Sequence, residues 1–223
     1  MVPILVLASA PVLPGFSFVV LLTLLAVVGV SSFVFWVLAW RATTRKRWLD
    51  LSYWAASNKL RLYRPERARV PTPLDSFGNP PPDPLLLLAN KRTSVAQLQA
   101  QAPRAVAGGA ARWNVLVRQI ATDWPPVGLR PAHHASSLLD LISLSSYPAL
   151  LPPERFVAFG SDPAAIRHLA RSTIVALLPP DVGFVLYGPA LILDFSDRPF
   201  DTIELSRMVA LADQLEARLP PPV

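Results

Sequence analysis

The chain has 223 residues, of which 52% are apolar and only 16% charged, a balance that favours a membrane-attached protein. It contains no cysteine, which excludes a disulfide framework, a thiolate metal site and a cysteine nucleophile. The net charge of +6 comes from residues 41–70, which hold nine basic and two acidic side chains, whereas residues 71–223 hold 12 basic and 13 acidic ones. Because a nucleic-acid surface needs its cations on the folded domain, we expect no nucleic-acid partner.

Residues 16–40, FSFVVLLTLLAVVGVSSFVFWVLAW, contain neither a charged residue nor a proline. A helix of this length covers a membrane core of about 30 Å, so the sequence predicts a transmembrane helix after a short N-terminal segment, 1–15. A buried core helix would need a large protein around it. A secretory signal peptide is the sharper alternative, because residues 8–10 read ASA, but no basic residue precedes them.

A cationic cluster follows the predicted span at once. We expect the following tryptophans and basic residues to lie at the membrane interface and to set the orientation: Trp36, Trp40, Arg41, Arg45, Lys46 and Arg47. The positive-inside rule then predicts residues 1–15 outside the membrane and residues 41–223 in the cytoplasm. The same cations can also hold anionic lipid headgroups, so membrane lipid is an expected partner.

The rest of the chain divides into a basic juxtamembrane segment, 41–69, and a predicted cytoplasmic domain, 70–223. The first contains an apolar helical stripe over 43–59 and a short strand, LRLYR. Residues 70–84 are a proline-rich connector. Strand patterns occur at 85–90, 113–120 and 155–160, whereas 93–99 fits either strand or helix.

Proline and glycine mark the remaining boundaries. We expect a loop at 102–111, irregular structure at 123–134 and a short helix at 137–143. The WPPVGLRP run within 123–134 is either a recognition loop or a cover for the sheet, and we favour the cover. Asp162 and Pro163 predict the start of a helix running to 178, and Gly188–Pro189 predict a hairpin turn. A last helix is predicted from Asp201 and Glu204, which have capping-box spacing. This order indicates an α+β fold with a largely antiparallel sheet.

The run from WPPVGLRPAHHASSLLDLISLSSYPALLPPERFVAFGSD to LLPPDVGFVLYGPALILDFSDRPFDTIELSRMVALADQLEARLP resembles the C-terminal region of a family of uncharacterised bacterial membrane proteins with a single span, of the kind found in planctomycetes. The resemblance extends upstream through RWNVLVRQI and the apolar helix. It implies a bacterial inner-membrane protein with a cytoplasmic α+β domain. It implies no activity and no catalytic residue.

Histidines give a weak metal signal. His133 and His134 are adjacent and would point in different directions on a helix or strand, and no motif links them to His168. Exposed or locally bonded histidine is the ordinary interpretation, so we expect no cofactor.

The acidic run LDFSDRPFD places Asp194, Asp197 and Asp201 around Arg198. These carboxylates can form an oxygen-ligand site or an acid/base pair, but they lack the glycine and closing glutamate of a calcium loop. A turn in which Asp197 or Asp201 contacts Arg198, with Asp201 also capping the last helix, explains the same residues, and we favour it.

Two functions of different classes remain. The cytoplasmic domain is either a binding or assembly module with a protein partner, or an enzyme whose site combines scattered residues such as His133, Asp140, Arg155 and Asp194. The sequence contains no GxSxG elbow, P-loop or dinucleotide fingerprint. We therefore favour the module.

Overall fold

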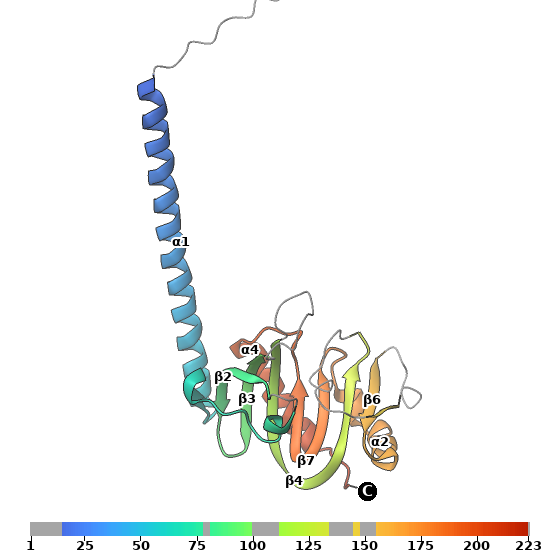
Figure 1. The fold of residues 1–223 in the computed structure, drawn as a ribbon. Helices are drawn as coiled ribbons and strands as arrows, with labels where there is room; N and C mark the ends of the chain where they lie inside the picture. Colours follow the sequence, from blue (N-terminus) through green and yellow to red (C-terminus); the bar gives the residue numbers. More distant parts are fainter. Residues whose placement is uncertain (1–14, 78–80, 100–111, 134–144, 148–154, 223) are drawn as a thin grey trace, which may run out of the picture. The chain divides into compact units, whose positions relative to one another are not determined.

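The computed structural model describes residues 15–77, 81–99, 112–133, 145–147 and 155–222. The chain divides into two compact units, Met1–Leu49 and Asp50–Val223. The second unit contains an antiparallel sheet with packed helices, and the long apolar helix lies at the N-terminal end, so the expected α+β class is confirmed (Figure 1). The helix predicted at 137–143 and the loop predicted at 102–111 lie outside the described residues.

Helix α1 runs without interruption over Gly15–Ser57, so the predicted span and the predicted juxtamembrane helix are parts of one helix. Past the apolar stretch, the hydroxyls of Thr43 and Thr44 donate to the Trp40 carbonyl oxygen at 2.9 and 2.8 Å, bonds that helical threonine makes readily. The helix ends in a Schellman motif. Lys59 adopts a φ of 57°, and the backbone N–H of Leu60 donates to the Ala55 carbonyl oxygen at 2.8 Å.

The sheet has seven strands in the order β1-β2-β3-β4-β6-β5, with β7 paired to β4, and every pairing is antiparallel. The strands are β1 (Arg61–Tyr63), β2 (Asp83–Ala89), β3 (Thr93–Gln99), β4 (Arg112–Pro131), β5 (Ser145–Tyr147), β6 (Phe156–Gly160) and β7 (Gly183–Asp194). The short strand predicted after the first helix is confirmed as β1, and the ambiguous segment 93–99 is strand β3.

Strands β4 and β7 hold the two halves of the sheet together. The first half of β4 lies between β3 and β7, and its second half lies between β6 and β7. Gly188, in the middle of β7, has a φ of +56°, and a Cβ at Gly183 would lie 3.1 Å from the Asp194 Cβ at the other end. A straight strand of this length would separate its ends by about 35 Å. The chain therefore folds back at the predicted Gly188–Pro189 turn, and β4 curves around it (Figure 1).

The prediction of irregular structure at 123–134 is wrong for most of that segment. Residues 123–131 belong to β4, so the WPPVGLRP run is part of the sheet and does not cover it. Pro125 and Pro126 lie where the register between β4 and β7 shifts, between Trp124 and Val127. An irregular position of this kind tolerates proline because the ladder does not need its missing N–H.

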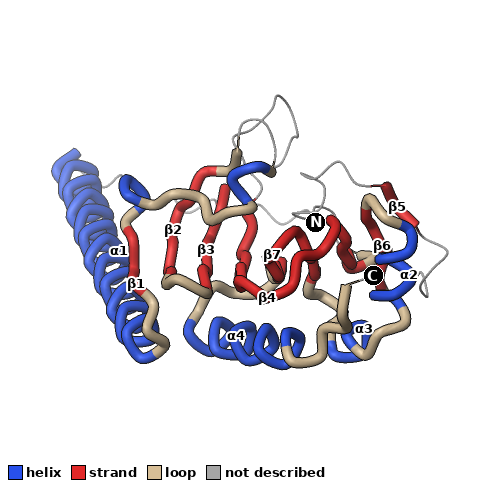
Figure 2. The backbone as a smooth tube through the Cα atoms, turned by 90° about the horizontal axis from the view of Figure 1, so that it is seen from below, coloured by secondary structure: helices blue, strands red, loops and turns tan. Residues whose placement is uncertain are grey.

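Helices cover one face of the sheet (Figure 2). They are α2 (Pro163–Ala170), α3 (Ile174–Leu177) and α4 (Thr202–Glu216), so the helix predicted over 163–178 is divided in two. Asp162 caps α2 through its side chain, as predicted. The larger hydrophobic core lies on this face and includes Trp54 and Leu205, whereas a smaller core on the other face includes Leu74 and Phe77 of the proline-rich connector. That connector contains the 3-10 helix η2 (Leu74–Ser76), and a second 3-10 helix, η1 (Pro65–Arg67), precedes it.

Candidate functional site

The apolar length of α1 is the first functional feature. Within the described residues, Val20–Ser57 is long and apolar enough to cross a membrane, and none of its most apolar 18-residue window is buried. The large apolar side chains that are exposed in the described parts of the chain all lie on α1, apart from Ile203. A core helix of a soluble protein would bury such side chains, so α1 has the character of a membrane anchor or a signal segment.

The predicted interface residues all lie on α1. The side chains of Trp36, Trp40, Arg41, Arg45, Lys46 and Arg47 are exposed. Trp36 also contacts Phe33, with 6.2 Å between the ring centroids. Their role in orienting the chain across a membrane stays a prediction.

The last turns of α1 belong to the core of the folded unit. Leu51, Trp54 and Ala55 are buried in the helix-side core together with residues of the sheet and α4. The indole N–H of Trp54 donates to the Ser206 hydroxyl oxygen at 2.8 Å, and that hydroxyl donates to the Thr202 carbonyl oxygen at 2.7 Å. The end of the apolar helix is therefore an integral element of the α+β unit.

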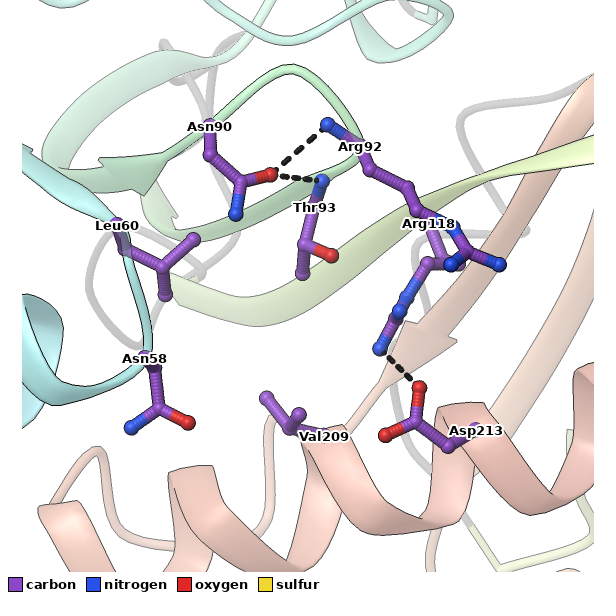
Figure 3. Close-up of a pocket in the computed structure, with 8 residues that line it drawn as sticks. All are labelled: Asn58, Leu60, Asn90, Arg92, Thr93, Arg118, Val209 and Asp213. Atoms are coloured by element: carbon purple, nitrogen blue, oxygen red, sulfur yellow. Dashed lines mark hydrogen bonds and ion pairs between the residues drawn. The ribbon is translucent and has the colours of Figure 1, made fainter.

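A polar cavity of about 180 Å³ lies beside these residues (Figure 3). Four elements meet there: the segment that ends α1, the turn between β2 and β3, strand β4, and helix α4. The lining residues are Asn58, Leu60, Asn90, Arg92, Thr93, Arg118, Val209 and Asp213.

Arg118 is the buried cation of this cavity. It pairs with Thr93 on β3 and Leu191 on β7 in the sheet register, and only 6% of the residue is exposed. Its Nη2 lies 2.7 Å from Asp213 Oδ1, whose side chain is 59% exposed. The buried Nε has no hydrogen-bond partner among the described residues.

The rim of the cavity is held by a turn and an ion pair. Asn90 Oδ1 accepts hydrogen bonds from the backbone N–H groups of Arg92 and Thr93 at 2.8 and 2.7 Å. Arg92 Nη2 lies 2.5 Å from Glu216 Oε1 on α4. Sequence reasoning missed this cavity. The available signal was Arg118 itself, a charge that shares a strand face with the apolar Leu116.

The acidic run 193–201 is held by structural bonds. Asp201 Oδ1 accepts from the backbone N–H of Glu204 at 2.9 Å, which confirms the predicted cap of α4. Asp194 is buried, and its Oδ1 accepts from the backbone N–H and the hydroxyl of Ser196. No group of three histidine, aspartate or glutamate side chains that could hold a metal occurs in the part of the chain that the structure describes.

Arg198 has two acidic partners, Asp181 and Glu204, that the sequence did not indicate, whereas its expected contact with Asp197 or Asp201 stays a prediction. Its Nε and Nη2 donate to the two carboxylate oxygens of Asp181 at 2.7 and 2.6 Å, and its Nη1 donates to Glu204. The hydrogen bonds that Arg198 donates to Asp181 raise the pKa of its guanidinium above the ordinary range, burial opposes this, and the bond to Glu204 adds to the rise. Asp181 lies 17 residues away in sequence, so no local pattern could reveal it.

The other candidate residues are dispersed. His133 follows β4 in an exposed turn, whereas His134 and Asp140 lie outside the described residues. His168, on α2, stacks on Trp124 with 6.3 Å between ring centroids. Arg155 donates from Nη2 to the Leu178 carbonyl oxygen at 2.7 Å.

No family model and no curated protein matches the chain. Among solved structures, the crystal structure of the mycobacterial trehalose monomycolate transport factor A, TtfA, is similar, with 12% sequence identity and a TM-score of 0.48. The similarity covers 77% of this chain and 95% of that chain. At this identity and score, it supports no inference about family or function.

Proposed function

We propose that this protein is a single-pass membrane protein whose α+β unit acts as a non-catalytic binding or assembly module. The proposal rests on one observation: two parts of helix α1 differ in their burial. Its apolar stretch exposes side chains such as Leu24 and Phe35, whereas Leu51 and Trp54 of the same helix are packed into the α+β core. A helix with both properties links a membrane to a folded unit.

The proposed location is a bacterial inner membrane, with residues 1–15 outside and the α+β unit in the cytoplasm. The basic cluster that follows Trp40 supports this orientation, because cationic segments are retained on the cytoplasmic side. Each of these cations near anionic headgroups contributes about 1 kcal/mol to membrane attachment. The expected partners are thus membrane lipid and a protein met at the membrane surface.

A membrane-tethered enzyme is the alternative. Two side chains named for it are already engaged in structural bonds: Arg155 with the Leu178 carbonyl oxygen, and Asp194 with Ser196. The carboxylate of Asp194 is also buried in the sheet. These contacts favour the binding module.

Introduced cysteines test the topology directly, because the natural chain has none. We expect Ser9→Cys to react with a membrane-impermeant maleimide in intact cells, and Ile203→Cys, which is exposed, to react only after the cells are permeabilised. Replacing the four basic residues Arg41, Arg45, Lys46 and Arg47 with glutamine should give a mixture of both patterns. Labelling of Ile203→Cys in intact cells would reverse the proposed orientation. Extraction of the chain from membranes by alkaline carbonate would refute the anchor.

The module itself is tested by copurification from detergent-solubilised membranes. A binding module should retain a defined partner at fixed stoichiometry, and this complex should persist in Asp194→Asn, because that carboxylate is assigned a structural role. Loss of the partner in a variant that remains folded and in the membrane would instead place function in the acidic run.

A further inference from the structure

We propose that the cavity around Arg118 is a binding site for a small oxyanion, that is, a phosphate or carboxylate group. The proposal is independent of the membrane anchor, since every residue that lines the cavity lies in the Asp50–Val223 unit.

The guanidinium of Arg118 is buried with fewer partners than it can bind. An arginine carries five N–H donors in a planar fork. Here, Asp213 contacts Nη2, and the buried Nε has no partner among the described residues. A buried donor without a partner is costly. Nε has almost no accessible surface, so an oxyanion would accept from the Nη end of Arg118 where this residue lines the cavity, or from Nε and one Nη group in bidentate geometry once the guanidinium turns toward the ligand.

The surrounding groups suit an acceptor-rich ligand. Asn90 turns its carbonyl oxygen to the backbone of the β2–β3 turn (Figure 3). Its amide nitrogen donates to the Lys59 carbonyl oxygen at 3.4 Å, which leaves its second N–H for a ligand. Thr93 and Arg92 also line the cavity, and the guanidinium of Arg92 is paired with Glu216. A volume of 180 Å³ equals the share of about six liquid waters, which accommodates a phosphate group and a few further atoms.

Asp213 is the resident counter-ion in this view. Its side chain is 59% exposed, so it can turn to solvent when a ligand oxyanion takes its place. The competing explanation is that the ion pair of Arg118 with Asp213 only ties α4 to the sheet. The two explanations predict different results for Asp213→Asn. If Asp213 competes with a ligand, removing its charge strengthens anion binding. If the ion pair is purely structural, neither the parent nor the variant binds an anion.

The test uses the full chain in phosphatidylcholine nanodiscs, titrated with inorganic phosphate and with acetate at constant ionic strength by calorimetry. We expect saturable binding that Asp213→Asn strengthens roughly threefold to tenfold. Arg118→Lys keeps the charge but loses the fork and should weaken binding at least about tenfold. Arg207→Met is the matched control: it removes an exposed cation from the same helix, outside the cavity, and should change nothing.

Absence of saturable phosphate and acetate binding in both the parent and Asp213→Asn would overturn the proposal, and the Asp213 variant keeps this outcome clear if Arg118→Lys misfolds. Unchanged affinity in a folded Arg118→Lys chain, or an equal loss in Arg207→Met, would overturn it as well. Nanodiscs containing phosphatidylglycerol distinguish the source of the oxyanion. If phosphatidylglycerol competes with free phosphate, the natural oxyanion is a lipid headgroup. If phosphate binding is unchanged in these nanodiscs, the natural oxyanion belongs to a soluble small molecule.

Discussion

The end of α1 gives the sharpest prediction about where the folded unit begins. The sequence pattern suggests a boundary at residue 70, whereas buried residues upstream suggest one near residue 43. Leu51, Trp54 and Leu60 are 3%, 8% and 6% exposed, and all three pack in the helix-side core. At about 1.5–3 kcal/mol for each buried side chain, their loss removes roughly 5–9 kcal/mol. A domain of this size has only about 5–15 kcal/mol of net stability.

We therefore expect a fragment of residues 43–223 to unfold cooperatively in urea, followed by circular dichroism and tryptophan fluorescence. A fragment of residues 70–223 should have no cooperative transition, since it also loses β1, which pairs with β2. Leu51→Ala in the longer fragment should cost about 2–5 kcal/mol, while the control Trp48→Ala, whose side chain is partly exposed, should cost far less. If the shorter fragment unfolds at the same urea concentration as the longer one, the end of α1 is not part of the core.

Three substitutions test the other local interactions by urea unfolding of the full chain in detergent. Asp201→Ala removes the cap of α4 and should cost on the order of 1 kcal/mol, whereas an unchanged midpoint would contradict the capping role. Arg198→Met leaves the buried Glu204 and its neighbour Asp181 without their shared cation and should cost about 2–3 kcal/mol, and Arg198→Lys should recover only part of this. Lys59→Gly relieves a left-handed backbone position and should stabilise by about 0.5–1 kcal/mol; destabilisation would show that the lysine side chain contributes more than the strain costs.

Local signals predicted the local elements well. The caps at Asp162 and Asp201 are bonds between side chains and a backbone N–H two or three residues ahead, so sequence spacing contains all the information they need. The turn at Gly188–Pro189 is equally local, because its left-handed φ requires glycine or a similar residue. The fold class follows from the order of such elements.

Structure that depends on distant partners was not predictable in this way. Residues 123–131 contain proline signals that favour irregular structure, yet they form a strand because β6 and β7 pair with them. The same limit applies to Arg198, whose partner Asp181 comes from the segment before β7. The alternation of side chains in residues 113–120 correctly predicted a strand. It did not predict that both faces of this strand are buried.

The polar cavity shows the same limit for function. Its lining residues lie between positions 58 and 213 in the sequence and meet only after the sheet and α4 have formed. A motif search cannot find such a site, because its lining residues come from elements that are far apart in the sequence.

The two proposals rest on different residues and therefore separate experimentally. Orientation depends on the cations at positions 41–47, which belong to the first unit, whereas oxyanion binding depends on Arg118 and Asp213 in the second. Neutralising the first set should alter topology and leave phosphate affinity unchanged, while Arg118→Lys should do the reverse. If neutralising positions 41–47 also weakened phosphate binding in the nanodisc assay at constant ionic strength, the juxtamembrane cations would help to hold the anion, and its assignment to Arg118 would be overturned.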